Sequence, residues 1–257
     1  MPHRALIVLQ ENSGRVSLPD GVSGPVRDTI FAMVDQLAEN FEDIKTTLQA
    51  SGRYDVVYLL TDNACTRDQL LGKLMLGNTQ NLEFDLIILG HGNEQELALK
   101  SGPNLTTGVN GNIRSLITEA RTHGYNSTSF NLSMVYMCNC YGSCSNDDWL
   151  SIGAKVSIGS DKNDWMPEPM TTFFIQNWLN HRTASDAAQD AYNRTVPFYK
   201  PIFPDKPQPC FVDKKVPDPL HPGKTKTVKV PGTVMITDQR ILDSRLVVGG
   251  LGTVRKP

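Results

Sequence analysis

The sequence predicts an α/β fold with a mostly parallel β-sheet between layers of helices, plus a C-terminal β-rich extension. Short apolar segments rich in β-branched residues alternate with segments whose apolar residues recur every three or four positions. The strand segments are nearly continuous apolar runs, which is typical of strands covered on both faces. From Pro197 onward the helical periodicity disappears, and this part holds ten of the 16 prolines.

The expected core elements follow one another along the chain. A helix begins at Pro25, because proline fits the first turn of a helix, and it ends near Ala50. A hairpin is expected near Leu97–Leu105. Gly124 suits the position just after a helix end. The other strands are expected at Arg4–Gln10, Tyr54–Thr61, Phe84–Leu89, Leu132–Met137 and Ala154–Gly159, and the other helices at Thr66–Met75, Asn112–Thr122, Thr171–Leu179 and Ala184–Arg194.

The last part of the chain is expected to form β structure. Lys224–Val230 and Thr233–Thr237 flank Pro231-Gly232, a turn signal, so a hairpin with its turn at this dipeptide is predicted. We therefore expect a main domain over residues 1–199 and an extension over 200–257 that is packed on the core or appended to it.

Composition narrows the classes of partner and compartment. The chain has 257 residues and a formal net charge of −2, which provides no general attraction to nucleic acid or to an anionic membrane. No stretch reaches 18 apolar residues, and the apolar run from Ala5 to Leu9 is too short for a signal peptide. Five cysteines, three of them within seven residues, do not suggest a disulfide framework. We expect a cytoplasmic protein with free thiols and without nucleic-acid or membrane partners.

Two predicted strands end in residues that carry chemistry. The strand over Phe84–Leu89 is followed by Gly90-His91-Gly92, and the strand over Leu132–Met137 is followed by a cysteine-rich turn with Cys140. Parallel sheets place functional groups at the carboxyl ends of their strands. A cysteine nucleophile needs a base, and imidazole suits that role near neutral pH. The N–H groups of Gly92 and Cys140 are candidates for holding the oxyanion of a tetrahedral intermediate.

These motifs resemble those of the caspase-like cysteine peptidases, which include caspases, metacaspases, gingipains, clostripain, separase and the CHAT domains. The resemblance covers roughly residues 4–195 and is carried by IILGHG at 87–92 and VYMCNCYGS at 135–143. His91 and Cys140 are 140 − 91 = 49 residues apart, close to the roughly 50 that separate the caspase pair. The resemblance implies a caspase-like α/β/α sandwich and a Cys–His dyad that cleaves peptide bonds in protein or peptide substrates. It implies no cofactor, and an activating or inhibitory protein partner is conceivable.

The choice of nucleophile and of specificity residues depends on the turn after the strand. Cys138 should still belong to the strand, whereas Cys140 falls on the exposed turn, so Cys140 is preferred over Cys138 and Cys144. Metacaspases carry an acidic residue two positions before the nucleophile, and this chain has Cys138 there. As the acid of a substrate pocket we favour Asp161, with Trp165 as an aromatic wall. The other acidic candidates are Asp147, Asp148, Asp164 and Glu168.

Three other interpretations remain open at this point. The cysteine run could bind a metal ion, but it lacks a matching second pair of ligands, so no metal is expected. The domain could be a non-catalytic caspase-like module that binds a partner through the same face. It could also be a cysteine hydrolase that acts on non-peptide acyl groups.

Overall fold

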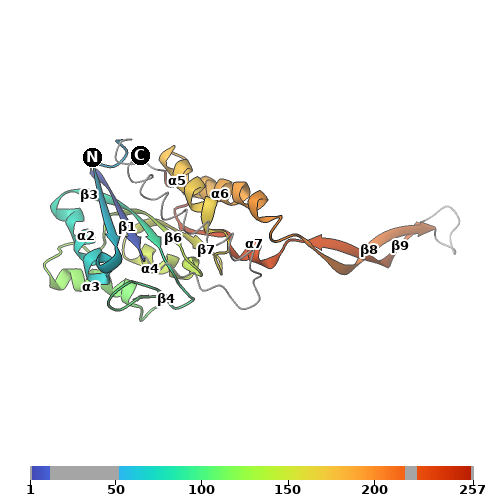
Figure 1. Cartoon of the computed structure of the whole chain (residues 1–257), viewed down its shortest axis with the longest axis horizontal. Helices are drawn as coiled ribbons and strands as arrows, with labels where there is room; N and C mark the ends of the chain where they lie inside the picture. Colours follow the sequence, from blue (N-terminus) through green and yellow to red (C-terminus); the bar gives the residue numbers. More distant parts are fainter. Residues whose placement is uncertain (1, 12–51, 218–224, 256–257) are drawn as a thin grey trace.

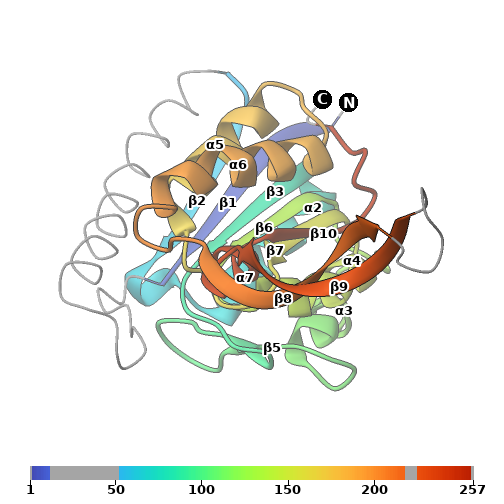
Figure 2. The same cartoon turned by 90° about the vertical axis from the view of Figure 1, so that its right-hand side faces the viewer.

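The structure, a computed structural model, describes residues 2–11, 52–217 and 225–255. The predicted helix between Pro25 and Ala50 lies outside the described residues. Figures 1 and 2 show a body built around one β-sheet, with a long two-stranded hairpin projecting from it. No helix in the described ranges has both the length and the apolar character needed to cross a membrane.

The central sheet has six strands in the order β10-β7-β6-β3-β1-β2. Neighbouring strands run parallel, except that β10 is antiparallel to β7 at the edge of the sheet. The carboxyl ends of β1, β3, β6 and β7 therefore meet at one edge of the sheet. The strands are β1 (His3–Gln10), β2 (Val56–Thr61), β3 (Leu82–Leu89), β6 (Leu132–Cys138), β7 (Ala154–Ser160) and β10 (Leu246–Gly250).

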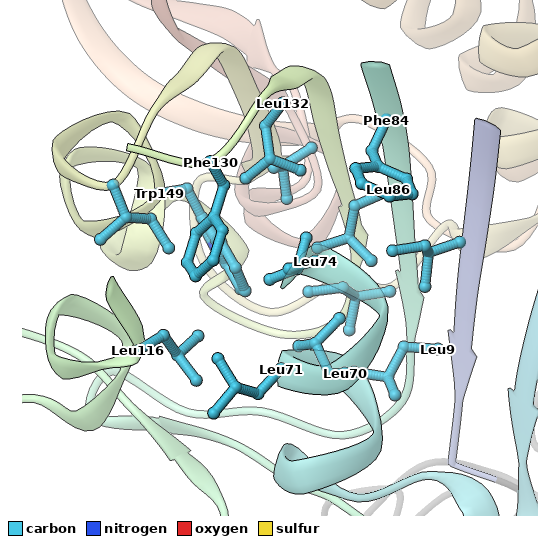
Figure 3. Packing of buried hydrophobic residues seen from close by; sticks show 14 of the residues in the cluster. Leu9, Leu70, Leu71, Leu74, Phe84, Leu86, Leu116, Phe130, Leu132 and Trp149 are labelled. Carbon is cyan, nitrogen blue, oxygen red and sulfur yellow. The ribbon is translucent and has the colours of Figure 1, made fainter. Parts of the chain in front are cut away.

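Helices cover both faces of the sheet and bury two separate hydrophobic cores. Helices α5 (Pro167–Leu179) and α6 (Ala184–Tyr199) pack on one face, where Leu6 and Val8 of β1 point. The other face is covered by α2 (Arg67–Thr79), α3 (Asn112–Thr122) and α4 (Asn146–Ser151). Figure 3 shows this second core, in which Leu70 and Leu74 of α2 meet Leu86 of β3. The predicted three-layer α/β/α class is therefore confirmed.

Several helix boundaries follow from capping residues in the sequence. The Thr66 hydroxyl accepts a hydrogen bond of 3.2 Å from the backbone N–H of Gln69 at the start of α2. The Thr183 hydroxyl does the same for Asp186 at the start of α6, at 3.0 Å. Such side-chain oxygens satisfy N–H groups that have no partner within the helix. Helix α3 occupies the predicted residues, and Gly124 beyond it has φ of +87°.

The C-terminal hairpin forms with a different pairing from the predicted one. Strand β8 (Lys206–Pro217) pairs antiparallel with β9 (Thr225–Ile236) over twelve residue pairs. The prediction of a turn at Pro231-Gly232 is wrong, because both residues lie inside β9, opposite Phe211 and Cys210. A much smaller antiparallel pair, β4 (Glu96–Leu97) with β5 (Leu105–Thr106), forms where a hairpin was predicted.

Residues 200–255 divide into two parts that the sequence did not separate. The hairpin of β8 and β9 projects from the body, as Figure 1 shows. The chain then returns through α7 (Gln239–Asp243) and adds β10 to the central sheet, where Leu246 pairs with Ser160. Beyond β10, the carbonyl of Gly252 accepts a hydrogen bond of 3.0 Å from the N–H of Ser185 in α6. The last segment is thus an integral part of the core.

Candidate active site

His91 lies just beyond β3 and is held by a carboxylate from the neighbouring strand. Glu11 directly follows β1, which pairs with β3, so the two residues meet at the same edge of the sheet. Glu11 Oε2 accepts a hydrogen bond of 3.0 Å from the backbone N–H of His91 and lies 3.2 Å from its Nδ1. The Glu11 side chain is 12% exposed and that of His91 is 42% exposed. One carboxylate oxygen therefore fixes both the backbone and the ring of His91.

Glu11 was not identified from the sequence, which indicated only a Cys–His pair. Its position was the one sequence feature that could have identified it, because Glu11 is a polar residue just beyond the buried strand β1, as His91 is just beyond β3. The contact depends on β1 and β3 being neighbours in the sheet, and the sequence does not specify that order.

The three clustered cysteines occupy three different environments. Cys138 is the last residue of β6 and is buried, with 6% of its surface exposed. Cys140 stands two residues further, half-buried, and Tyr141 next to it adopts a left-handed conformation with φ of +58°. Cys144 is exposed on the 3₁₀ turn η2 (Gly142–Ser145) that leads into α4. Cys140 therefore lies at a sharp transition from strand to helix.

The loop that carries His91 touches the turn that carries Cys140. The N–H of Gly90 donates a hydrogen bond of 3.3 Å to the carbonyl of Cys138. A Cβ atom at Gly92 would overlap the Asn139 side chain and lie 2.8 Å from the carbonyl oxygen of Cys140. Since no side chain fits at position 92, its glycine is what allows this approach. The two candidate catalytic loops are thus in direct contact.

Two glycines let the Cys140 turn rest on β7. Gly159 lies near the end of β7, and a Cβ atom there would lie 2.6 Å from the backbone nitrogen of Ser143. A Cβ atom at Gly142 would lie 3.1 Å from the Cα of Gly159. Backbone therefore packs on backbone at this point, and the close packing fixes the position of the turn.

An acidic residue that follows β7 lies against the cysteines. Asp164 Oδ2 is 3.8 Å from Cys138 Sγ, and Asp164 Oδ1 accepts a hydrogen bond of 3.2 Å from the N–H of Met166. Burial raises the pKa of Asp164 to about 7. Burial likewise raises the pKa of Glu168 to about 7, and the nearby Asp164 carboxylate adds to the shift. This side of the site therefore holds two carboxyl groups that change charge near neutral pH.

The same environment keeps the Cys140 thiol protonated. Burial is the main cause that raises the pKa of Cys140, and the Asp164 carboxylate raises this pKa as well. A hydrogen bond from the backbone N–H of Asp164 lowers it, but does not cancel the rise. Burial raises the pKa of Cys138 much further. Because a thiolate is the reactive species, a base must take up the Cys140 proton when a substrate is attacked.

The predicted specificity residues Asp161 and Trp165 flank Asp164 in the sequence. Asp161 is exposed, and its backbone N–H donates a hydrogen bond of 2.8 Å to the carbonyl of Arg245. Trp165 packs edge-on against Phe203, with ring centroids 6.5 Å apart. The carboxylate that raises the pKa of the Cys140 thiol is that of Asp164. The roles assigned to Asp161 and Trp165 stay predictions.

The other acidic candidates have separate environments. Asp148 is buried, forms an ion pair with Arg114 and accepts a hydrogen bond of 2.8 Å from the N–H of Gly108. Asp147 is exposed on α4. Across the described ranges, no three His, Cys, Asp or Glu side chains are grouped so that they could hold a metal ion.

The backbone N–H groups of Gly92 and Cys140 were predicted to bind an oxyanion. Within the described residues, neither group donates a hydrogen bond to another residue. Gly92 forms an antiparallel bridge with Leu97, but the two hydrogen bonds of this bridge are made by neighbouring residues. The N–H of Ala98 donates to the carbonyl of His91, and the N–H of Asn93 donates to the carbonyl of Glu96, both at 2.9 Å. The oxyanion role stays a prediction.

The six-stranded sheet, its antiparallel edge strand and the helices on both faces form a three-layer α/β/α sandwich. No family model matches the chain, and no curated protein matches it. Among solved structures, it is similar to a secreted C11 cysteine protease from Bacteroides thetaiotaomicron, whose X-ray structure contains an irreversible peptide inhibitor. The two are 12% identical with a TM-score of 0.40, and the match covers 77% of this chain and 60% of the protease.

Proposed function

We propose that the chain is a cysteine peptidase that cleaves peptide bonds with Cys140 as nucleophile and His91 as its acid–base partner. The observation that carries the proposal is the contact between the His91 loop and the Cys140 turn, with the Glu11 carboxylate on His91 Nδ1. Nucleophilic acyl transfer requires a thiol and an oriented imidazole on adjacent loops, and both loops lie at the carboxyl edge of the parallel sheet.

In the proposed mechanism, Nδ1 donates to Glu11, and Nε2 is the ring nitrogen that exchanges a proton with Cys140. As the thiol loses its proton to Nε2, the sulfur attacks the carbonyl carbon and the carbonyl oxygen becomes an oxyanion. The N–H groups of Gly92 and Cys140 stabilise that oxyanion. The intermediate collapses, Nε2 returns the proton to the leaving amine, and a thioester remains on Cys140. Water then hydrolyses the thioester, with Nε2 accepting one proton from the water and returning it to the departing sulfur.

The raised pKa of the Cys140 thiol fits a nucleophile that is activated only when substrate is bound. Burial and the nearby Asp164 carboxylate both favour the neutral thiol. Proton transfer to His91 therefore has to accompany the attack, and the resting enzyme is protected from non-specific oxidation and alkylation.

We further propose that Asp164 selects a basic residue before the scissile bond. Its carboxylate lies 3.8 Å from the Cys138 sulfur and raises the pKa of Cys140, whereas Asp161 is exposed. The pKa of Asp164 is raised to about 7 because the ionised form is poorly solvated. A lysine or arginine side chain placed against it would favour the ionised form, and this gain is available only to basic substrates.

The test is cleavage of short fluorogenic peptides that differ only in the residue before the scissile bond. We expect cleavage after lysine or arginine and none after aspartate or leucine. Cys140→Ala should reduce kcat/KM by at least a thousandfold, because the nucleophile is lost, whereas Cys144→Ala should stay within about twofold of the wild-type chain. Asp164→Asn should selectively reduce the cleavage of basic peptides.

A thiol-directed activity probe separates the proposal from its alternatives. The probe should label the wild-type chain at Cys140 in preference to the other four cysteines. Absence of labelling, together with absence of cleavage of any peptide, would assign the chain to a non-catalytic module. Labelling at Cys140 without peptide cleavage would instead favour a hydrolase of non-peptide acyl groups.

A further inference from the structure

The hairpin of β8 and β9, which we call the arm, is a two-stranded sheet without a third strand in the described residues. It projects well beyond the body in Figure 1, and in Figure 2 it curves toward the viewer in front of the body. Twelve residues per strand correspond to a length of about 40 Å. Isolated two-stranded hairpins are only marginally stable in water, so an arm of this length calls for a partner.

The root of the arm is fixed beside the candidate active site. Arg245 and Asp243, which follow the arm, accept backbone hydrogen bonds of 2.8 and 2.9 Å from Asp161 and Lys162. At the base, Lys206 Nζ lies 3.0 Å from Asp238 Oδ2. The segment over residues 161–164 therefore lies next to the residues at the root of the arm.

Charge is distributed unevenly between the arm and the rest of the chain. The two strands carry five lysines and one aspartate, which leaves 20 basic and 26 acidic residues elsewhere in the sequence. Four of the lysines lie in the half of the arm away from the root: Lys214, Lys215, Lys226 and Lys229. The register places Lys214 and Lys226 on one face of the arm and Lys215 and Lys229 on the other. The outer half thus carries basic side chains on both faces of an otherwise acidic protein, and it is complementary to an acidic segment.

The half of the arm next to the root is apolar and exposed. Of the seven large hydrophobic side chains that are exposed among the described residues, four lie here: Phe211, Val234, Met235 and Ile236. Phe211 is 71% exposed and Met235 is 59% exposed. The register places Phe211 and Met235 on one face and Val234 and Ile236 on the other, and exposed apolar side chains of this kind mark binding surfaces. Pro207 and Pro209 lack an N–H group to offer a further strand, so this half contacts a partner through side chains.

We propose that the arm is a second binding site for the protein substrate. The segment it binds has apolar residues near the cleavage site, which contact the half of the arm next to the root, and acidic residues further away, which contact the lysines of the outer half. This proposal rests on the proposed peptidase function and extends it from the residue at the scissile bond to a segment of about twelve residues. A protein segment is favoured over nucleic acid because the arm strands contain no arginine and their exposed root is apolar.

The first experiment compares three quenched fluorescent peptides with the same short cleavable core. The first peptide has no extension. The second continues beyond the core for 15 residues, in which leucine residues are followed by glutamate residues. The third is the same except that lysine replaces every glutamate. We expect the glutamate extension to increase kcat/KM about tenfold and the lysine extension to give no gain. The double variant Lys214→Glu/Lys229→Glu should lose the gain while cleaving the short core at the wild-type rate. The matched control Lys100→Glu/Arg121→Glu, which makes the same charge change on the exposed body, should keep it.

Equal effects of the arm substitutions on the short and extended peptides, or an unchanged gain, would overturn the proposal. Phe211→Ala gives an independent measure, since it should reduce the gain several-fold without any change of charge. A gain that depends on the glutamates but not on Phe211 would overturn the apolar part of the contact.

A second experiment measures binding without catalysis, in the full chain with Cys140→Ala. Fluorescence anisotropy of a labelled glutamate extension should show binding that weakens with salt and is lost in Lys214→Glu/Lys229→Glu. Binding without cleavage of any core would refute the peptidase but support the arm, whereas cleavage without binding would refute the arm alone. Tighter binding of single-stranded DNA of equal charge, or a dimer that the arm substitutions dissociate, would overturn the substrate proposal.

Discussion

Glu11 and His91 show how one carboxylate can orient a histidine. The same oxygen, Oε2, accepts the backbone N–H of His91 and faces Nδ1 of its ring. A carboxylate in this place favours the tautomer with the proton on Nδ1, and in the proposed peptidase it would stabilise the imidazolium formed during acyl transfer. Glu11 acts through His91, so it is a positioning residue.

Glu11→Gln should lower kcat by about ten- to a hundredfold and leave KM within about twofold. Glutamine keeps an oxygen for the two N–H groups but lacks the charge that stabilises the imidazolium. Steady-state kinetics on the short basic peptide would measure kcat and KM separately, with thermal unfolding as a control for folding. A rise in KM as large as the fall in kcat, or a kcat equal to that of the wild type, would exclude the positioning role.

Asp85 is a second carboxylate at the residue scale, and its contribution is structural. It is buried in β3, where its Oδ2 accepts hydrogen bonds of 2.6 Å from the hydroxyl of Tyr54 and 2.8 Å from Nε1 of Trp178. Burial and the nearby carboxylate raise the pKa of Tyr54 far above its usual range. This network links the residues before β2, the centre of the sheet and α5.

Tyr54→Phe should lower the free energy of unfolding by about 1–3 kcal/mol, because the buried Asp85 loses a hydrogen-bond donor. Peptidase activity should not change, since Tyr54 lies outside the candidate site. Tyr58→Phe is the matched control on the neighbouring strand and should have an effect near zero. Denaturant unfolding of the two variants gives the comparison, and equal effects would contradict the assigned role of the network.

At the scale of elements, the packing of η2 on β7 sets the position of the Cys140 turn. Gly159→Ala should reduce kcat/KM by at least tenfold, because the new methyl group would collide with the backbone of Gly142 and Ser143. The expected loss comes from displacement of the turn, so thiol-probe labelling of Cys140 should fall in parallel. Gly72→Ala on α2, where a Cβ meets nothing within 4 Å, should be active and about 1 kcal/mol more stable.

Sequence patterns predicted the elements well where the signals are local. Strand ends and helix caps depend on neighbouring residues, so α3 and the positions of His91 and Cys140 beyond β3 and β6 could be derived. The contact with Glu11 depends on the order of the strands. The position of Asp164 depends on the path of the loop after β7. Both are set by packing across the whole sheet, which one sequence does not reveal.

The misplaced hairpin turn has a similar cause. Pro231-Gly232 is a strong local turn signal, but twelve cross-strand pairs between β8 and β9 outweigh it. Proline is tolerated in a strand when its nitrogen faces away from the paired neighbour, and a two-stranded arm offers such positions along each edge. Local turn propensity is therefore a weak guide in long isolated hairpins.

At the scale of the whole molecule, the buried carboxyl of Glu168 and the partly buried carboxyl of Asp164 make stability depend on pH. Their pKa is raised to about 7, above the value of about 4 in an unfolded chain. The folded state therefore binds more protons than the unfolded state, and stability falls as the pH rises from about 4 to about 7. The lowered pKa of Asp238, caused mainly by its hydrogen bonds to Arg240, acts in the opposite direction at more acidic pH.

The Tm should accordingly be higher at pH 5.5 than at pH 8. Asp164→Asn/Glu168→Gln should flatten this dependence, because neither neutral side chain has to ionise within the folded protein. Thermal unfolding at both pH values tests the prediction. An undiminished pH dependence in the double variant would show that other groups cause it.

The antiparallel strand β10 has a consequence for how the protein is made. It is the last strand of the described residues, so this edge of β7 stays open until synthesis has passed residue 250. Open strand edges pair with other chains, and a nascent protein in this state is prone to aggregate. A chain truncated at residue 205, near the domain boundary that the sequence suggested, should be insoluble. A chain in which a short linker replaces residues 206–236 should stay soluble, because Lys206 and Ile236 are paired neighbours.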